Sequence, residues 1–375
     1  MEAIITAAAN GAQTAAVENQ TSVAVIPEKT ETGARQAAWR LFGTSLEADM
    51  TAAEAMEKAN LNYQVESEEI CRVPKEVADA IRNGQPMIGW HPTVDSLISS
   101  HKATYRSDHG TTLGVVGKSY GIVQNDVAFS FLDYIAKVSD IKPKLETAGS
   151  LGNGESVFVT ARLGEDFDLG GGDMVNPYLV ISNRHDGKGS VSVFFTPIRV
   201  ICQNSLNVAL RNSVNRVNFT HTTRVNDRIA REQEDISLAK RVLGENMEFN
   251  KAFLEEMTAL REQRVNGEYV RDFIAHMVLT PAQNKLYRMA GYKLDDVEEI
   301  ATVTKNRFRA LTEVLNTGIG QQQHRGTKLW LLNGVTTLHN EKVWKSGEDE
   351  FNSVMSGTML NNAQKAYNYL TRKAA

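Results

Sequence analysis

Apolar and polar residues alternate with two different periods along the first half of the chain, which predicts a mixture of helices and strands. Thr51 and Glu54 have the spacing of a capping box, and the apolar stripe that follows them predicts a short helix. Residues 62–65 and 112–117 alternate as strands do, whereas the apolar positions of 124–138 recur with the period of a helix. This half of the chain therefore predicts an α+β arrangement.

The centre of the chain has the strongest strand pattern. β-Branched and aromatic residues are frequent in 156–163, 178–183 and 190–196, and turn-forming residues separate these segments. Asp186 and Gly187 lie between the last two segments, and this dipeptide favours the tight turn of a hairpin. The three segments predict a central antiparallel sheet.

After Ile201 the pattern becomes helical, and we expect it to remain helical to the end of the chain. Apolar residues between 225 and 243 predict a long amphipathic helix with one buried face. Further helices are predicted over 272–287, 296–316 and 327–342. The expected fold class is α+β, with a central antiparallel β-sheet, flanking helices and a helical C-terminal region.

The length of 375 residues suggests two structural units behind a short tail. Residues 1–32 contain few large apolar side chains, so they bury too little surface to offset the entropy of ordering, and we predict a flexible N-terminal tail. A segment that becomes ordered on a partner is the alternative. An α+β core is predicted over 33–210, and a mainly helical region over 211–375.

Charge and cysteine content narrow the classes of function. The chain has 41 Lys and Arg against 45 Asp and Glu, a net charge of -4, so a site for a polyanion must be local. Cys71 and Cys202 are the only cysteines and have no His or Cys at ligand spacing, so we expect no structural metal and no cofactor. No apolar run is long enough to cross a bilayer, and we predict a cytoplasmic protein without membrane contact.

Sequence motifs of the common enzyme classes are absent. The triple glycine at 170–172 is not followed by the Lys and Ser or Thr of a phosphate-binding loop, and we predict an ordinary loop there. There is no nucleophile elbow and no zinc-protease motif. The acidic run 295–299 is expected to mark the start of a helix rather than a metal site. We therefore assign no catalytic residue.

Arginine is concentrated after the predicted hairpin. Residues 199–231 contain six arginines, no lysine and a single acid, Asp227, in a chain that is acidic as a whole. The planar guanidinium group binds phosphate oxygens in pairs, and asparagine side chains can bind sugar or base edges. The spacing of the last three arginines places them on one face of a helix. The candidate nucleic-acid-binding residues are Arg199, Asn204, Asn207, Arg211, Arg216, Arg224, Arg228 and Arg231, together with Lys118 and Tyr120.

Two interpretations of these arginines stay open. They can form ion pairs with acidic helices of the same chain or with a neighbouring subunit, or they can bind single-stranded nucleic acid. Tyr178, Phe194 and Phe195 on the adjacent predicted strands are candidates for stacking on bases, although at least one of them is expected in the core.

Six separated blocks of the sequence resemble one family. The blocks comprise Trp39 with 42–44; 49–51, 54–55 and 59–63; 114–120 and 123–125; Asn183 with 185–187; 196–200, 202–204 and 206–207; and 326–327, 329–330, Asn333 and 335–336. In this order they resemble the phage/plasmid-like proteins of domain of unknown function 932, over about Trp39 to Asn340. In that family the last block continues with an acid, an aromatic residue and Asp-His, whereas this chain has Thr337, Leu338, Asn340 and Glu341.

The resemblance implies carriage on phages, plasmids or prophages, and it supplies no activity or catalytic residues. We predict a protein that binds single-stranded DNA, as a homo-oligomer, for protection or annealing during replication, recombination or entry. The alternative is a non-enzymatic interaction protein that binds a host factor for the mobile element. A third possibility is an enzyme, for which the polar residues of the blocks are the candidates. They are Lys118, Tyr120, His185, Asp186 and Arg199.

Overall fold

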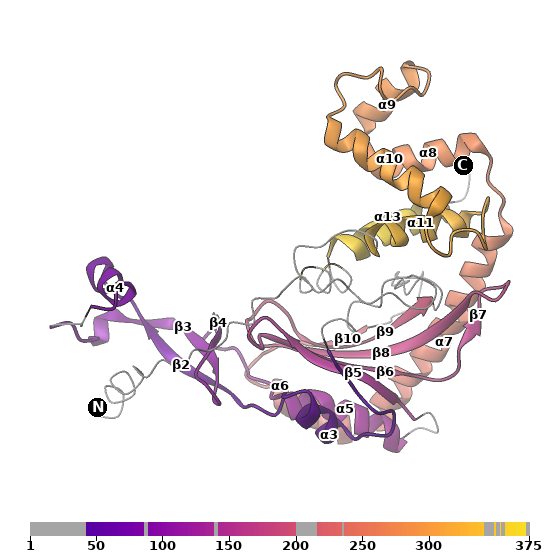
Figure 1. Cartoon of the computed structure of the whole chain (residues 1–375). Helices are drawn as coiled ribbons and strands as arrows, with labels where there is room; N and C mark the ends of the chain where they lie inside the picture. The colour runs from indigo at the N-terminus through magenta and orange to yellow at the C-terminus, as the bar shows by residue number, and fades with distance from the viewer. Residues whose placement is uncertain are drawn as a thin grey trace.

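A computed structural model describes the chain over residues 43–85, 89–138, 142–199, 216–234, 236–340, 349, 353 and 357–372. The described residues form two antiparallel sheets, helices that pack on the larger sheet and a set of C-terminal helices, so the predicted α+β class is confirmed (Figure 1). The predicted tail at 1–32 lies outside the described residues, and the division at residue 210 stays a prediction.

The larger sheet has seven strands in the order β1-β5-β6-β8-β9-β10, with β7 paired to one end of β8. Every neighbouring pair is antiparallel. The strands are β1 (Thr44–Ser45), β5 (Lys144–Leu151), β6 (Ser156–Arg162), β7 (Phe167–Asp168), β8 (Met174–Arg184), β9 (Val191–Arg199) and β10 (Arg216–Phe219). The predicted hairpin is confirmed, because β8 pairs with β9 across the turn that contains Asp186 and Gly187.

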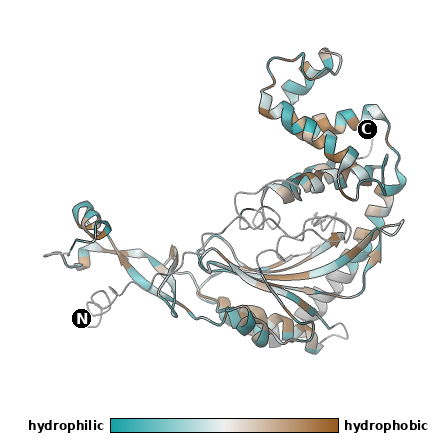
Figure 2. Cartoon of the chain, viewed as in Figure 1, coloured by the Kyte–Doolittle hydropathy of each residue, from teal (hydrophilic) through white to brown (hydrophobic). Residues whose placement is uncertain are grey.

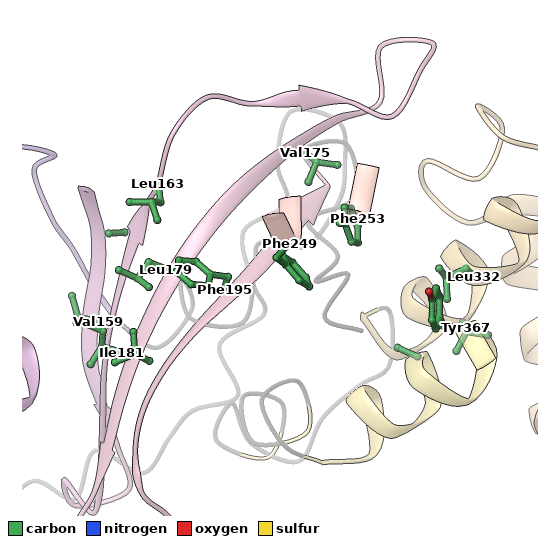
Figure 3. Packing of buried hydrophobic residues seen from close by; sticks show 14 of the residues in the cluster. Val159, Leu163, Val175, Leu179, Ile181, Phe195, Phe249, Phe253, Leu332 and Tyr367 are labelled. Atoms are coloured by element: carbon green, nitrogen blue, oxygen red, sulfur yellow. The ribbon is translucent and has the colours of Figure 1, made fainter. Parts of the chain in front are cut away.

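Four helices cover one face of this sheet: α3 (Ala52–Lys58), α5 (Asn125–Val138), α6 (Val225–Glu234) and α7 (Ile236–Glu262) (Figure 1). The predicted capping box is present at the start of α3, where Thr51 and Glu54 bond each other's backbone. On α7, Phe249 and Phe253 are fully buried beside Phe195 and Val175 of the sheet (Figure 3). Burial of each phenylalanine side chain contributes about 1.5–3 kcal/mol, so α7 holds the helical region onto the sheet.

The opposite face of the sheet is also buried. Phe158, Tyr178, Val180 and Phe194 form a second apolar cluster there, which includes Met359 of the last helix. With both faces covered, strands β6 and β8 are buried at nearly every position. Tyr178, Phe194 and Phe195 are each less than 5% exposed, so the suggestion that they stack on bases is wrong.

The C-terminal helices are α8 (Gly267–Val278), α9 (Pro281–Met289), α10 (Thr302–Thr317), α11 (Lys328–Asn340) and α13 (Thr358–Leu370). They confirm the expected helical C-terminal region. Trp330 of α11 is buried and donates a hydrogen bond from Nε1 to the carbonyl of Leu315, which joins α11 to α10. The acidic run 295–299 does not start a helix, because α10 begins only at Thr302. Instead, Asp295 forms an ion pair with Arg309 of α10.

Strand β10 corrects the expectation that the chain is helical throughout after Ile201. Residues Arg216–Phe219 pair with β9 in the large sheet, and the Phe219 side chain is fully buried against Phe131 of α5. Four residues are too few for periodicity to distinguish a strand. Cross-strand pairing and the burial of Phe219 stabilise this strand, and neither is visible in the local pattern.

The second sheet forms an arm that projects from the body of the molecule (Figure 1). It consists of β2 (Val65–Cys71), α4 (Lys75–Arg82), a short 3-10 helix (Val94–Ser96), β3 (Leu97–Arg106) and β4 (Thr112–Gly117). Apolar segments, brown in Figure 2, occur along it, and several of its large apolar side chains are exposed. They are Val73, Ile81, Val94, Leu97, Ile98 and Val115, six of the eight large apolar residues exposed in the described chain. The sequence pattern misses β3 because its polar residues do not alternate with apolar ones.

Candidate functional site

The candidate site is the exposed side of α6 and the chain that leads into it. Arg228 and Arg231 lie in α6, and Arg224 directly precedes it, with its carbonyl accepting the first helical hydrogen bond from Arg228 N–H at 3.0 Å. All three arginines are exposed, whereas Val225 and Ile229 are buried on the other side of the helix. The three arginines therefore form a row about 10 Å long on one exposed face of the helix, as their spacing predicts, and we call it the arginine row.

Among the side chains that the structure describes, which leave out those of residues 232–247, no carboxylate lies within 4.0 Å of these three guanidinium groups. Other arginines of the chain do have such partners, for example Arg184 with Asp186 at 2.6 Å. Arg228 lies over the ring of Phe219, with its guanidinium carbon 5.2 Å from the ring centroid. This contact orients the side chain without neutralising its charge. The row presents three positive charges to solvent.

Tyr120 lies beside the start of α6, although the two segments are about a hundred residues apart in sequence. Asn226 Nδ2 donates to the carbonyl of Ile122 at 2.9 Å, and His221 Nδ1 donates to the carbonyl of Gly121 at 2.9 Å. The rings of Tyr120 and His221 stack with centroids 4.6 Å apart. His221 was not predicted as part of the site, and no local pattern could have indicated these contacts.

The remaining predicted residues are placed only in part. Lys118 is exposed in the turn that follows β4, two residues before Tyr120. Arg199 is the last residue of β9, where it pairs with Val175, and Arg216 is the first residue of β10. Asn204, Asn207 and Arg211 lie outside the described residues. The structure thus brings Tyr120 to the start of the arginine row.

Two of the enzyme candidates belong to a buried polar cluster where the arm joins the body. His185 is fully buried and its Nε2 is 2.9 Å from Asn125 Oδ1; Asn125 Nδ2 in turn donates to the carbonyl of Leu61. Burial, with a smaller contribution from His221, lowers the pKa of His185 to about 3. The imidazole is therefore neutral at physiological pH, and we infer that its Nε2–H donates to Asn125.

Asp186 stabilises the hairpin turn. Its two carboxylate oxygens accept hydrogen bonds from Arg184 Nε at 3.1 Å and Nη2 at 2.6 Å, and one of them also accepts from the Lys188 N–H at 3.0 Å. Burial acts to raise the pKa of Asp186, but these charged and amide donors lower it below its usual value. Tyr120 donates its hydroxyl to the Arg184 carbonyl at 2.6 Å. These contacts give His185, Asp186 and Tyr120 structural roles.

The neutral state of His185 predicts a pH-dependent stability. The unfolded histidine binds a proton near pH 6.5, whereas the folded one does so only near pH 3. The free energy of unfolding should therefore be highest above pH 6.5 and fall below it by up to about 1.4 kcal/mol per pH unit. Urea denaturation at pH 7.5 and pH 5 tests this in the wild-type chain and in His185→Gln, which keeps a donor for Asn125. The free energy of unfolding should fall less between the two pH values in the variant, because glutamine does not take up a proton. An equal fall in both proteins would show that His185 is not its cause.

A groove lies on the other side of α6. It has a volume of about 560 Å³ and is formed between α3, α5 and α6. Met56, Val127 and Ile229 supply apolar walls, and Asp126 is exposed at the groove. Successive residues of a helix are rotated by about 100° around its axis. The residues of α6 that line the groove therefore lie about 180° around the helix from the arginine row. The groove and the row are therefore separate surfaces.

Among the described helices, none is both long and apolar enough to cross a membrane. In the same part of the chain, no three His, Cys, Asp or Glu side chains are close enough together to hold a metal ion.

Comparison with known proteins gives one match. The model of the family described as Domain of unknown function (DUF932) matches residues 112–356, which is more than half of the chain. The resemblance found in the sequence blocks is thereby confirmed for this family. Neither a curated protein nor a solved structure matches the chain.

Proposed function

This chain belongs to the family Domain of unknown function (DUF932), and we propose that it binds single-stranded DNA through the arginine row of α6 on behalf of a phage or plasmid. The observation that supports the proposal is the row itself. Arg224, Arg228 and Arg231 are exposed and aligned, and no carboxylate among the described side chains lies within ion-pair distance of them. Asp227, the acid of α6 whose side chain the structure describes, is exposed beside them without such a contact.

The geometry of the row favours one strand. Three guanidinium groups along about 10 Å of a single helix can follow consecutive phosphates of one backbone. A duplex presents two backbones across a groove, and the short row can contact only one of them. Guanidinium groups bind phosphate oxygens through paired hydrogen bonds, and the counterions released make such binding dependent on salt.

Fluorescence anisotropy of labelled oligothymidine and of a labelled duplex across a salt series tests this proposal. We expect tighter binding of the single strand and an affinity that falls steeply as salt increases. Equal or tighter binding of the duplex would contradict the single-strand preference. If neither DNA binds at low salt, the proposed function is wrong, and the next experiment is a search for a host protein that binds the arm.

We also propose that a second copy of the chain covers the exposed apolar side chains of the arm, which gives a homo-oligomer. The groove between α3, α5 and α6 is open and apolar, and it lies away from the arginine row. Helix α4 at the tip of the arm has exposed Ile81 and Lys75, which complement the apolar walls of the groove and Asp126 beside it. An arm that enters the groove of the next copy makes a head-to-tail contact, which produces a ring or a filament.

Light scattering of arm variants tests this assembly. The double change Ile81→Asp and Val94→Asp should reduce the mass of the oligomer to that of a single chain, because it places charge in the apolar contact. Met289→Asp with Val303→Asp is the matched control, since these two apolar residues are also exposed but lie on α9 and α10. A mass unchanged by the arm variant would contradict the proposed contact, and a wild-type monomer would contradict the oligomer.

A further inference from the structure

A second group of arginines surrounds a hollow at the far end of α7. The hollow has a volume of about 400 Å³ and is lined by the end of α7, the loop between β7 and β8, and the loop before α11. Arg261, Arg264 and Arg325 line it together with a single acid, Glu262. Helix α7 has 27 residues and is about 40 Å long, so this hollow is remote from the row on α6.

These three guanidinium groups also have no carboxylate within ion-pair distance among the described residues. Arg264 Nη1 donates to the carbonyl of Arg325 at 3.1 Å, which joins two of the lining segments. The side chains of Arg264 and Arg325 are exposed, and that of Arg261 is half-buried. Three positive charges therefore meet in a hollow that contains one negative charge.

Gly170 leaves the room that Arg261 occupies. A Cβ atom at residue 170 would lie 1.3 Å from Arg261 Nη1, and the backbone there has a φ of +106° that other residues rarely adopt. Gly171 continues the loop and also lines the hollow. The Asp168 carboxylate accepts hydrogen bonds from the Gly170 and Gly172 N–H groups at 2.7 and 3.2 Å, which fixes the loop. Within the triple glycine, Gly170 is therefore the residue that lets the backbone approach a guanidinium group.

The walls of the hollow are held in place by buried polar contacts. His324 Nε2 lies 2.7 Å from Asp173 Oδ2, and these side chains are 3% and 0% exposed, so the loop before α11 is fixed to the β7–β8 loop. Thr327 pairs with Arg264 as an isolated antiparallel bridge, and its hydroxyl donates to the His324 carbonyl at 2.7 Å. Because these segments are positioned before any ligand arrives, little ordering entropy is lost on binding.

We propose that this hollow is a binding site for the phosphate group of a nucleotide, either free or at the 5′ end of a strand. A phosphate monoester has up to two negative charges and three terminal oxygens, which match three guanidinium donors better than a carboxylate does. The volume admits one or two phosphate groups. The site is independent of the α6 row, so either proposal can fail without the other.

Calorimetric titration of the full chain with pyrophosphate, at low ionic strength, tests the site. The wild-type chain should bind, and Arg261→Gln or Arg325→Gln should lower the affinity about tenfold or more, because each removes a charge-assisted donor. Arg307→Gln is the matched control, as Arg307 is exposed on α10 and away from the hollow. Gly170→Ala should weaken binding as Arg261→Gln does, since its methyl group displaces the Arg261 guanidinium.

Two more probes distinguish the sources of the phosphate. In a chain with the three α6 arginines changed to glutamate, thymidine 5′-monophosphate should bind as tightly as a 5′-phosphorylated oligothymidine if the ligand is a free nucleotide. If the ligand is a strand end, the phosphorylated oligomer should bind at least tenfold more tightly than the nucleotide or the 5′-hydroxyl oligomer. The proposal is overturned if no probe binds the wild-type chain, or if Arg261→Gln and Arg307→Gln bind pyrophosphate equally.

Discussion

Changing Arg224, Arg228 and Arg231 together to glutamate is expected to weaken the binding of labelled oligothymidine about a hundredfold or more at low salt. The change removes three charge-assisted contacts with phosphate and introduces repulsion in their place. It should also reduce the slope of log affinity against log salt by about two, because three phosphates are no longer neutralised and each contributes about 0.7 for a single strand. Anisotropy titrations at several salt concentrations measure both effects.

A matched variant separates the row from net charge. Lys285→Glu, Lys293→Glu and Arg307→Glu change the charge of the chain by the same amount at exposed positions on or near α9 and α10. We expect this control to bind nearly as the wild-type chain does. If both triple variants lose affinity equally, the net charge of the molecule explains the binding. If neither loses affinity, the row on α6 is not the site.

Replacing Asp173 by alanine is expected to lower the free energy of unfolding by about 1–3 kcal/mol. Asp173 and His324 are both buried, and removing the carboxylate leaves the imidazole without its partner in a site closed to water. The loss also frees the β7–β8 loop from the loop before α11. Urea denaturation monitored by tryptophan fluorescence gives the change in free energy.

The control for this prediction is an exposed ion pair. Asp295 pairs with Arg309, and the two side chains are 73% and 53% exposed. Asp295→Ala should therefore cost no more than about 1 kcal/mol, because water screens the charges and replaces the hydrogen bonds. Similar losses in Asp173→Ala and Asp295→Ala would contradict the importance assigned to the buried pair.

The parts of the fold that follow from the sequence are those with strong local patterns. The capping box at Thr51, strands β6, β8 and β9 and the turn at Asp186 and Gly187 are found where they were predicted. Strands β3, β5 and β10 were missed, and only Val65 of β2 falls within the predicted strand 62–65. The residues of β3 are mostly polar and do not alternate with apolar ones, and β10 has only four residues and depends on the burial of Phe219.

Some features of the candidate site likewise follow from a local pattern, and others depend on long-range packing. The spacing of Arg224, Arg228 and Arg231 is a local property of one helix, so the sequence predicts their common exposed face. The contact of Tyr120 with His221, and the meeting of Arg261 with Arg325, depend on how distant segments pack, and no spacing indicates them. The prediction that aromatic side chains of the sheet stack on bases failed for the same reason. Distant segments cover both faces of the sheet and bury these side chains.

Photo-crosslinking of the wild-type chain to an oligothymidine containing bromodeoxyuridine, followed by mass spectrometry of the peptides, tests the central claim most directly. We expect cross-links to peptides that contain 224–231 and to the neighbouring segment around Tyr120. These cross-links should weaken as salt increases. Cross-links confined to other parts of the chain, or none at low salt, would contradict the claim that the arginine row of α6 binds single-stranded DNA.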